Sequence, residues 1–401
     1  MRAVAPQIDD KLLYLTSRDG RERPVRASGE IPSATRAVGA LPGLSAGAWV
    51  DDSSDRRWAR PTTEELENDI DHFHVPPAGI AHRSSWAEWH YFNVLSADGH
   101  RWAFISFIVA GDVSRVGKWG GRVLVTLHGD AVRERRFVGE ARPSTVVFST
   151  GRADLQIGGS TVRLLPDGQY AVRAHALEVG GSGVLDVDLV IRPTPYAYFP
   201  GASIASDDFA SGYTVPALRA NAWGRVCVGG RRRCETFDGT QAYHDHNWGV
   251  WRGVTWEWGA ARVGQYGILY GRVQPPDSLG AAAPLFVYLV DTLGFRAVFR
   301  PERVFYDDSR VIQLGQRALR VPSRVLLSDV RGSDTLRLEV TVDDAAATDM
   351  RRPITERGSA DESQGVAHPY FIQMKGDARL TGRAGGAPID GTGTGFFETY
   401  R

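Results

Sequence analysis

The sequence predicts an all-β protein made of two β-sandwich or β-barrel domains in tandem. Alternating polar and apolar residues and short apolar runs begin near Trp86 and return after residue 220. Glycine-rich and Asp-Gly turns separate these runs, and long segments with the 3.6-residue period of a helix are almost absent. Short strands with turn signals between them are typical of antiparallel sandwiches and barrels.

We expect residues 1–69 to form an irregular N-terminal segment with one short helix. Gly, Ser, Pro, Asp and Arg dominate this segment. Thr62 and Glu65 have the spacing of a capping box, so we expect a helix to begin there. Pro76 and Pro77 follow, and the helix is therefore confined to residues 61–75.

The rest of the chain divides into two similar β domains. We expect the first at residues 70–205 and the second at 220–401. Residues 206–219 are expected to form a linker, because this stretch is rich in Ala, Ser, Asp and Gly. In a tandem arrangement the functional site usually lies at the domain junction. The clearest strand candidates are 102–109, 122–127, 144–149, 184–191, 267–273, 285–290, 336–342 and 395–400.

Composition excludes several function classes. The 401 residues include 47 Lys and Arg and 47 Asp and Glu, so the chain lacks the basic excess of a nucleic-acid binder. No Walker loop or His-Glu-x-x-His string occurs, and no Gly-x-Gly-x-x-Gly lies between a strand and a helix. The two cysteines, Cys227 and Cys234, flank a Gly-Gly turn; a cross-hairpin disulfide and two buried thiols both fit this spacing.

The sequence also bears on location. No run reaches the ~18–20 apolar residues of a membrane-spanning helix. Charged residues occupy the N-terminal stretch where a signal peptide needs its apolar run. We expect the protein in the cytoplasm or at a membrane surface, where peripheral contact would let it collect a lipophilic substrate. A signal removed before this numbering would instead place it in the periplasm or outside the cell. The oligomeric state stays open.

An unusual strand candidate at residues 243–249 reads Tyr-His-Asp-His-Asn-Trp-Gly. In an extended strand these residues alternate between two faces. One face carries His244, His246 and Trp248, and the other carries Tyr243, Asp245 and Asn247. Trp251, Trp256 and Trp258 follow closely. Such a density of polar and aromatic groups is foreign to an ordinary strand and indicates a functional segment or a polar anchor.

A second segment of this kind lies at residues 85–93. Alternation places Glu88 and His90 on the same face, with Trp89 and Tyr91 on the other. An inward carboxylate is costly unless it is paired, so Glu88 should meet His246 or an arginine of the second domain. With these segments, six of the ten histidines fall in two clusters: His72, His74, His82 and His90, and His244 and His246.

Three interpretations of these histidines compete. His244-x-His246 could hold a metal ion if His90 or Glu88 supplied a third ligand. Alternatively, His246 tuned by Asp245 or Glu88 could transfer a proton, with Trp faces holding an apolar substrate and stabilising positive charge. The polar groups could also only satisfy one another at a domain junction. We favour proton transfer and expect no tightly bound transition metal, because Asp245 and Asn247 fit better as hydrogen-bond partners.

The motifs resemble those of AttH-like proteins. Glu88-Trp89-His90-Tyr91-Phe92 resembles their Glu-Trp-Trp-Tyr-Phe motif, and residues 243–249 resemble the motif that opens their second half. The segments 211–216 and 391–400 also match, so the resemblance covers roughly residues 70–401. This superfamily includes the carotenoid 1,2-hydratases (hydroxyneurosporene synthases) and lipocalin-like pericyclases.

The resemblance implies two lipocalin-like β domains, an apolar pocket and no cofactor. In the hydratases an acid protonates an isoprenoid double bond and water captures the cation. Their motif histidine and tryptophan correspond to His246 and Trp248. Where the hydratases have Tyr-x-Asp, this chain has Tyr270-Gly271-Arg272, and His90 replaces a tryptophan. Both departures point to an altered substrate or chemistry.

We therefore expect a hydratase or cyclase that acts on a lipophilic polyene or isoprenoid. The candidate catalytic residues are His246, Asp245 and Glu88. The candidate substrate-binding residues are Trp248, Trp256, Trp258, His90, His244, Tyr243, Tyr270 and Arg272. A cofactor-free pericyclase and a non-catalytic carrier of a hydrophobic ligand are the alternatives.

Overall fold

The structure is a computed structural model that describes residues 14–16, 22–24, 71–77, 79–129, 132–205, 210–229, 234–251, 253–274, 285–349 and 369–401. Strands dominate it, and its two helical turns, η2 (Arg83–Ser85) and η3 (Pro143–Thr145), have three residues each. The all-β prediction is confirmed. The expected helix start at Thr62 lies outside the described residues, and residues 71–77 form no helix.

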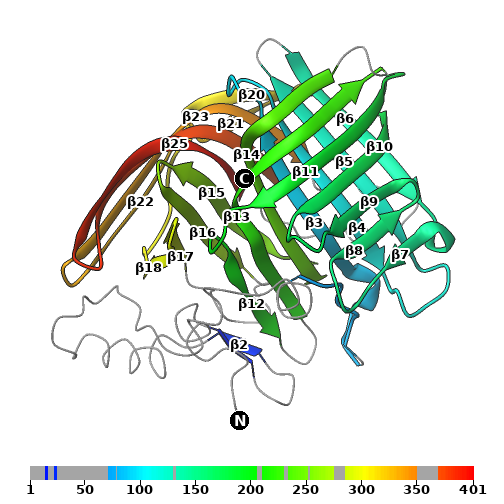
Figure 1. Cartoon of the computed structure of the whole chain (residues 1–401), viewed down its shortest axis with the longest axis horizontal. Coiled ribbons are helices and arrows are strands. Elements are labelled where there is room, and N and C mark those ends of the chain that lie inside the picture. The colour runs from blue at the N-terminus through cyan, green and yellow to red at the C-terminus, as the bar shows by residue number, and fades with distance from the viewer. Residues whose placement is uncertain are drawn as a thin grey trace.

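Eight strands close into a barrel. Their order is β11-β13-β14-β3-β4-β5-β6-β10, and pairing between β10 and β11 completes the ring (Figure 1). The strands are β3 (Trp86–Leu95), β4 (Trp102–Gly111), β5 (Trp119–Gly129), β6 (Val132–Ala141), β10 (Tyr170–Glu178), β11 (Val184–Pro193), β13 (Ala210–Val228) and β14 (Cys234–Val250). Four shorter strands extend this sheet: β7 (Val146–Phe148), β8 (Asp154–Ile157), β9 (Ser160–Leu164) and β12 (Phe199–Ala205).

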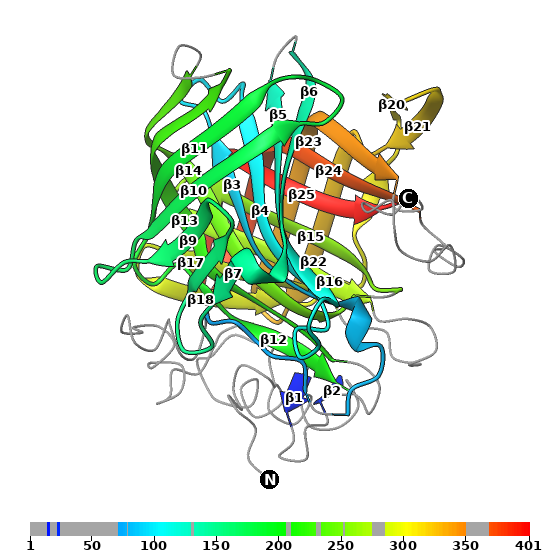
Figure 2. The same cartoon turned by 90° about the vertical axis from the view of Figure 1, so that its right-hand side faces the viewer.

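A second sheet of nine strands curls into a half-barrel beside the first, as Figure 2 shows. In spatial order its strands are β18 (Gly294–Phe299), β17 (Phe286–Asp291), β16 (Tyr266–Gln274), β15 (Thr255–Val263), β25 (Ala387–Tyr400), β24 (Tyr370–Ala384), β23 (Asp334–Asp349), β22 (Arg324–Arg331) and β19 (Phe305–Asp307). Two further two-stranded sheets pair β1 (Tyr14–Thr16) with β2 (Glu22–Pro24) and β20 (Arg310–Leu314) with β21 (Arg317–Val321). No helix in the described part of the chain has the length and apolarity to cross a membrane.

The expected linker at 206–219 is not a linker where the structure describes it. Residues 210–219 lie in β13, which pairs with β11, β12 and β14 inside the first sheet. Small side chains suit this position because neighbouring strands cover them; Ser211 and Ala217 are both buried. The chain passes from the barrel to the half-barrel between Val250 and Thr255.

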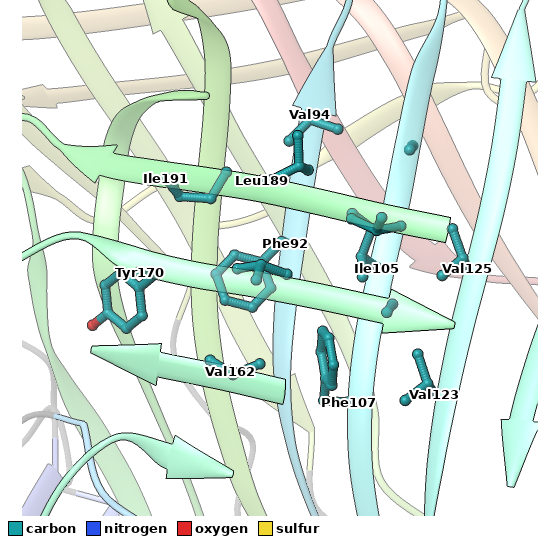
Figure 3. Close-up of a cluster of buried hydrophobic side chains, with 14 of the residues drawn as sticks. Phe92, Val94, Ile105, Phe107, Val123, Val125, Val162, Tyr170, Leu189 and Ile191 are labelled. Atoms are coloured by element: carbon teal, nitrogen blue, oxygen red, sulfur yellow. The ribbon is translucent and has the colours of Figure 1, made fainter. Parts of the chain in front are cut away.

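Three apolar cores hold the molecule together. One fills the barrel, where Phe92 and Tyr170 pack among aliphatic side chains (Figure 3). A second fills the half-barrel around Tyr270 and Phe397. A third joins the two sheets, and its residues include Tyr91, Tyr243 and Trp258. We call this third region the junction.

A disulfide links Cys227 on β13 with Cys234 on β14. The two residues are direct partners across the hairpin that these strands form. Of the two arrangements that the spacing allowed, the structure thus has the cross-hairpin bond.

Candidate active site

The polar residues that the sequence singled out lie on two paired strands, β3 and β14. The antiparallel register sets His246 opposite His90, Trp248 opposite Glu88, and Asp245 opposite Tyr91. Residues opposite one another share a face, so each face collects side chains from both strands. The faces predicted from alternation are confirmed for these pairs: His246 and Glu88 contact each other, whereas Tyr91 and Tyr243 belong to the junction.

Side chains on one face of these strands and two residues of the segment 71–77 form an inner cluster of six residues: Asp71, His74, Glu88, His90, His244 and His246. His246 lies at its centre and is fully buried. Its Nε2 atom is 2.8 Å from Oε1 of Glu88. Its Nδ1 atom is 2.7 Å from Oδ1 of Asp71, although this contact is bent away from a linear hydrogen bond. One imidazole therefore bridges two buried carboxylates, and the expected partnership of Glu88 with His246 is confirmed.

Glu88 also organises the segment before the barrel. The backbone N–H of His74 donates to both carboxylate oxygens of Glu88, at 2.8 Å each. The His74 ring places its Nδ1 atom 3.1 Å from Oε1 of Glu88. That ring lies flat on Trp248, with centroids 3.6 Å apart and planes 5° apart. Trp248 thus holds a histidine in place at the edge of the inner cluster.

Asp71 is the second anchor of the inner cluster. The Tyr170 hydroxyl donates to its Oδ2 atom at 2.6 Å, and Nε2 of His244 lies 3.4 Å from the same oxygen. The Nδ1–H group of His244 donates to the carbonyl of Tyr91 at 3.0 Å. His90 stacks on His246, and its Nδ1 atom is 3.6 Å from Oδ1 of Asp71. Asp71 therefore faces three imidazole rings at once.

The charges of this cluster are mutually dependent. Burial would lower the pKa of His246, but the hydrogen bond and charge of Asp71, with those of Glu88, outweigh burial and raise the pKa to about 9. Burial would raise the pKa of Asp71, but His90, His244 and His246 together hold it well below its usual range. Burial lowers the pKa of His90 and of His74. Among these three histidines, His246 is the one whose cationic form the cluster favours.

The opposite face carries a junction cluster made of Tyr91, Tyr243, Asp245, Trp256, Trp258 and Glu398. Glu398, on β25, accepts hydrogen bonds from the Tyr91 hydroxyl and from Nε1–H of Trp256, both at 2.9 Å. Gln373 donates to the same carboxylate at 3.2 Å. Trp258 donates its Nε1–H to the Tyr243 hydroxyl at 2.9 Å, and Asn247 donates to Asp245 at 2.6 Å. Side chains from both sheets thus meet at one polar centre.

Two carboxyl groups share this apolar environment. Burial, followed by the charge of Glu398, raises the pKa of Asp245 to about 8. Burial also raises the pKa of Glu398. Within the described residues, no Lys or Arg forms an ion pair with either carboxyl. Like charges in one apolar environment disfavour double ionisation, so the pair favours the state in which one carboxyl keeps its proton.

Aromatic rings surround the two carboxyls. Trp89 packs on Trp251 with centroids 4.7 Å apart, and Trp256 meets Tyr400 edge-on at 5.0 Å. Trp258 meets Tyr213 edge-on at 5.1 Å. Trp89, Trp251 and Trp256 are only partly buried, so this aromatic group reaches the surface.

The eleven residues predicted for one site occupy three places. His246, Glu88, His90 and His244 belong to the inner cluster, with Trp248 at its edge. Asp245, Tyr243, Trp256 and Trp258 belong to the junction cluster. Of the two carboxylates considered as partners of His246, Glu88 contacts it, whereas Asp245 lies on the opposite face of the strand, as alternation predicted.

Tyr270 and Arg272 lie in neither cluster. Tyr270 is buried in the half-barrel core. Arg272 forms an ion pair with Glu257 across the β15–β16 pair. Both are on β16, whose alternation turns them away from the junction and into the half-barrel.

Three residues of the two clusters were not among the site residues predicted from the sequence: Asp71, His74 and Glu398. The string Asp71-His-Phe-His74 carried a signal, since it places three titratable groups within four residues, shortly before an aromatic strand. Glu398 carried another, because it is an isolated carboxylate in the aromatic strand end Phe396–Tyr400.

A surface hollow of about 620 Å³ lies elsewhere, beside β19 and β22. Glu302, Arg303, Phe305 and Asp329 are among the residues that line it, and none belongs to either cluster. We place the candidate site at the junction, because convergent polar groups and perturbed carboxyls mark function better than volume alone.

The closed barrel with a curled half-barrel defines a two-unit, all-β architecture. No family model and no curated protein matches the sequence. Solved structures do match. A "putative AttH" from Nitrosomonas europaea is 16 % identical, with a TM-score of 0.50 over 84 % of this chain and 100 % of that chain. The predicted resemblance to AttH-like proteins is thus confirmed for the fold.

Two further structures align over 85 % of this chain and 97 % of their own. Kievitone hydratase from Nectria haematococca is 11 % identical, with a TM-score of 0.46. CghA with Sch210972 is 14 % identical, with a TM-score of 0.45.

Proposed function

We propose that the chain is a hydratase or cyclase that protonates a lipophilic polyene or isoprenoid at the junction, with the Asp245–Glu398 carboxyl pair as its acid and base. One observation carries the proposal: the buried carboxyl of Asp245 and the partly buried carboxyl of Glu398 lie among tryptophan and tyrosine side chains, and neither forms an ion pair with a Lys or Arg in the described residues. Carboxyl groups in an apolar environment are unfavourable for folding, and they are typical of sites where a perturbed pKa serves proton transfer.

The proposed reaction uses only proton movements and water. The protonated carboxyl gives its proton to one carbon of a substrate double bond, which leaves a carbocation on the other carbon. Ring faces of Trp256 and Trp258 stabilise that charge by cation–π attraction. Water then attacks the cation and gives a proton to the ionised carboxylate. That proton passes back to the carboxyl that acted as the acid, so the enzyme is restored and the net change is addition of water. In cyclisation a second double bond attacks instead, and the carboxylate removes a proton from the cyclised cation to form the neutral product.

The arrangement of donors supports separate roles for the two carboxyls. Glu398 accepts three hydrogen bonds, from Tyr91, Trp256 and Gln373, which favours its ionised form. The negative charge of Glu398 in turn favours the protonated form of Asp245. We assign the acid to Asp245 and the base to Glu398.

The proposal predicts that Asp245→Asn abolishes turnover but keeps binding. The probe is an acyclic isoprenoid polyene incubated in deuterated water, with product deuterium measured by mass spectrometry. Wild type should incorporate one deuterium per product, and Asp245→Asn should lose at least about 100-fold in rate, typical of a general acid. Asp238→Asn, an exposed carboxyl on the same strand, is the matched control and should stay near wild type.

The outcome separates the alternatives. Product without deuterium, formed equally by Asp245→Asn, would assign the junction to a pericyclase. Binding of the polyene without any product would assign it to a carrier. Either result contradicts the proposal.

A further inference from the structure

The inner cluster has a chemistry that the proposed function does not use. It gathers six titratable side chains in the barrel, and five of them, Asp71, Glu88, His90, His244 and His246, are at most 2 % exposed. Transferring so many ionisable groups from water costs several kcal/mol each unless charges are balanced. We infer that His74, Glu88 and His246 bind one divalent transition-metal ion of the zinc class.

The donor atoms have the required types and spacing. The three candidate ligand atoms lie within 4.8 Å of one another. Oε1 of Glu88 is 3.1 Å from Nδ1 of His74 and 2.8 Å from Nε2 of His246. A tetrahedral zinc ion with bonds of about 2.0–2.1 Å needs ligand atoms about 3.3 Å apart. Side-chain movements of about half an ångström would therefore admit the ion.

The residues that would orient the metal ligands are already in place. Metal-binding histidines usually give their other N–H to a carboxylate, which fixes the ring and raises its basicity. Nδ1 of His246 faces Oδ1 of Asp71 at 2.7 Å, while Nε2 faces the ligand position. Trp248 holds the His74 ring by stacking. Both imidazoles are thus oriented by residues outside the ligand set.

Unsatisfied polar atoms point to the same place. Oδ1 of Asp71, Nδ1 of His90 and Nδ1 of His246 are buried and lack a well-formed hydrogen bond among the described residues. His90 and His246 are at least 98 % buried. Two of these atoms, Nδ1 of His246 and Oδ1 of Asp71, face each other, and an ion bound to Nε2 would polarise the His246 ring and strengthen Nδ1–H as a donor to Asp71.

Access and coordination number indicate an open site. Three protein ligands leave a fourth position of a tetrahedral ion for water or a ligand oxygen, as in catalytic zinc sites. His74, whose side chain is 20 % exposed, lies on the solvent side of the cluster, and the ring of His72 is 4.2 Å from it. This conclusion differs from the expectation of no metal, because that expectation lacked Asp71 and His74.

Metal binding by the untagged full chain tests the inference. Protein stripped with a chelator and dialysed is titrated with Co²⁺ and then with Zn²⁺, and visible cobalt absorption reports the ligand field. Wild type should bind about one equivalent with a tetrahedral-type spectrum and gain thermal stability. His74→Ala and Glu88→Gln should each bind at least about 100-fold more weakly, and Asp71→Asn about 10–100-fold more weakly.

The control is His175→Ala, which removes an exposed histidine that pairs with Asp186 on the barrel exterior. It should bind like wild type, and circular dichroism should show that all variants are folded. Binding below about 0.1 equivalent by wild type, or unchanged binding by both His74→Ala and Glu88→Gln, overturns the inference. Asp245→Asn should keep its metal, so failure here and failure of the proposed function are distinguishable.

Discussion

At the residue scale, Asp71 shows how a single carboxylate orders its surroundings. It is fully buried, accepts a short hydrogen bond from Tyr170 and faces His90, His244 and His246. Its strongly lowered pKa means that the folded protein favours the anion. Each neighbour of this anion therefore contributes more than an ordinary neutral hydrogen bond would.

We predict that Tyr170→Phe destabilises the fold by about 1.5–3 kcal/mol, the usual value for a hydrogen bond to a charged group. The ring stays in the barrel core, so only the hydroxyl is lost. Urea unfolding in the presence of a chelator measures the change. Tyr370→Phe, whose hydroxyl contacts an exposed arginine, should change stability by less than about 0.5 kcal/mol. Equal effects of the two substitutions would show that the hydroxyl of Tyr170 has no special role.

At the scale of elements, glycines on neighbouring strands make room for the tryptophan rings. Gly271 on β16 is the direct partner of Trp258 on β15, and Gly212 on β13 is the partner of Trp248 on β14. A Cβ atom at Gly271 would lie 2.6 Å from the Trp258 ring, and one at Gly212 would lie 2.4 Å from the Trp248 ring. Each ring thus lies across the backbone of the adjacent strand.

Gly271→Ala should therefore displace Trp258 and cost about 1–3 kcal/mol, as overpacking does. Under the proposed function, turnover should fall as well, because Trp258 and its partner Tyr243 would shift. Urea unfolding and the polyene assay check both effects. Gly159→Ala is the control, since a Cβ atom there has nothing within 4 Å. Wild-type stability and turnover of Gly271→Ala would contradict the prediction, because the Trp258 ring would then move aside without loss of unfolding free energy.

At the scale of the whole molecule, hydrogen bonds tie the barrel to the half-barrel. Tyr91 contacts Glu398, and Nε1–H of Trp102 donates to Asp344 on β23 at 3.0 Å. His128 stacks on Trp102 with centroids 3.8 Å apart, and its Nδ1 atom is 3.7 Å from the same carboxylate. These contacts make the association of the sheets dependent on charge.

We predict that His128 makes stability pH-dependent below about pH 6.5, the ordinary pKa of histidine. Burial lowers its pKa in the folded state, with a smaller contribution from Arg136, while Glu134 and Asp344 oppose this. The unfolded chain then binds more protons, so the contribution of His128 is present above pH 6.5 and is lost as pH falls.

His128→Phe keeps the stacking but cannot take up the proton. Its unfolding free energy should fall less steeply between pH 7 and pH 5 than that of wild type, by up to about 1.4 kcal/mol per pH unit. Parallel curves for the two proteins would contradict the prediction.

The sequence was informative where the physics is local. Alternation with a period of two depends on one strand alone, so it correctly separated Asp245 from His244 and His246. The Glu88–His246 contact was also predictable. A buried carboxylate is costly without a charged or hydrogen-bonding partner, and the sequence contained few candidates for that partner.

The sequence did not predict the contacts that depend on the order of the strands in the sheets. Asp71 is 173 residues from His244, and Tyr91 is 307 residues from Glu398. Only the closed order of the barrel and the packing of the half-barrel bring them together, and no local pattern encodes that order. The buried small residues of β13 resembled a linker for the same reason, since their burial depends on strands elsewhere in the chain.

Strand β14 contributes alternate side chains to the inner cluster and the junction cluster, so changes in its sequence and in its length have different consequences. Inserting or deleting one residue before Tyr243 would exchange the two faces, turning the imidazoles into the junction and the carboxyl into the barrel. Both clusters would be lost in one step, whereas a substitution affects only one face. A substitution in β14 can therefore change one cluster and leave the other intact. A change of length between the disulfide at Cys234 and Val250 would alter both clusters, except where a β-bulge absorbs the extra residue, as the register shift between Thr240 and Asp238 already does.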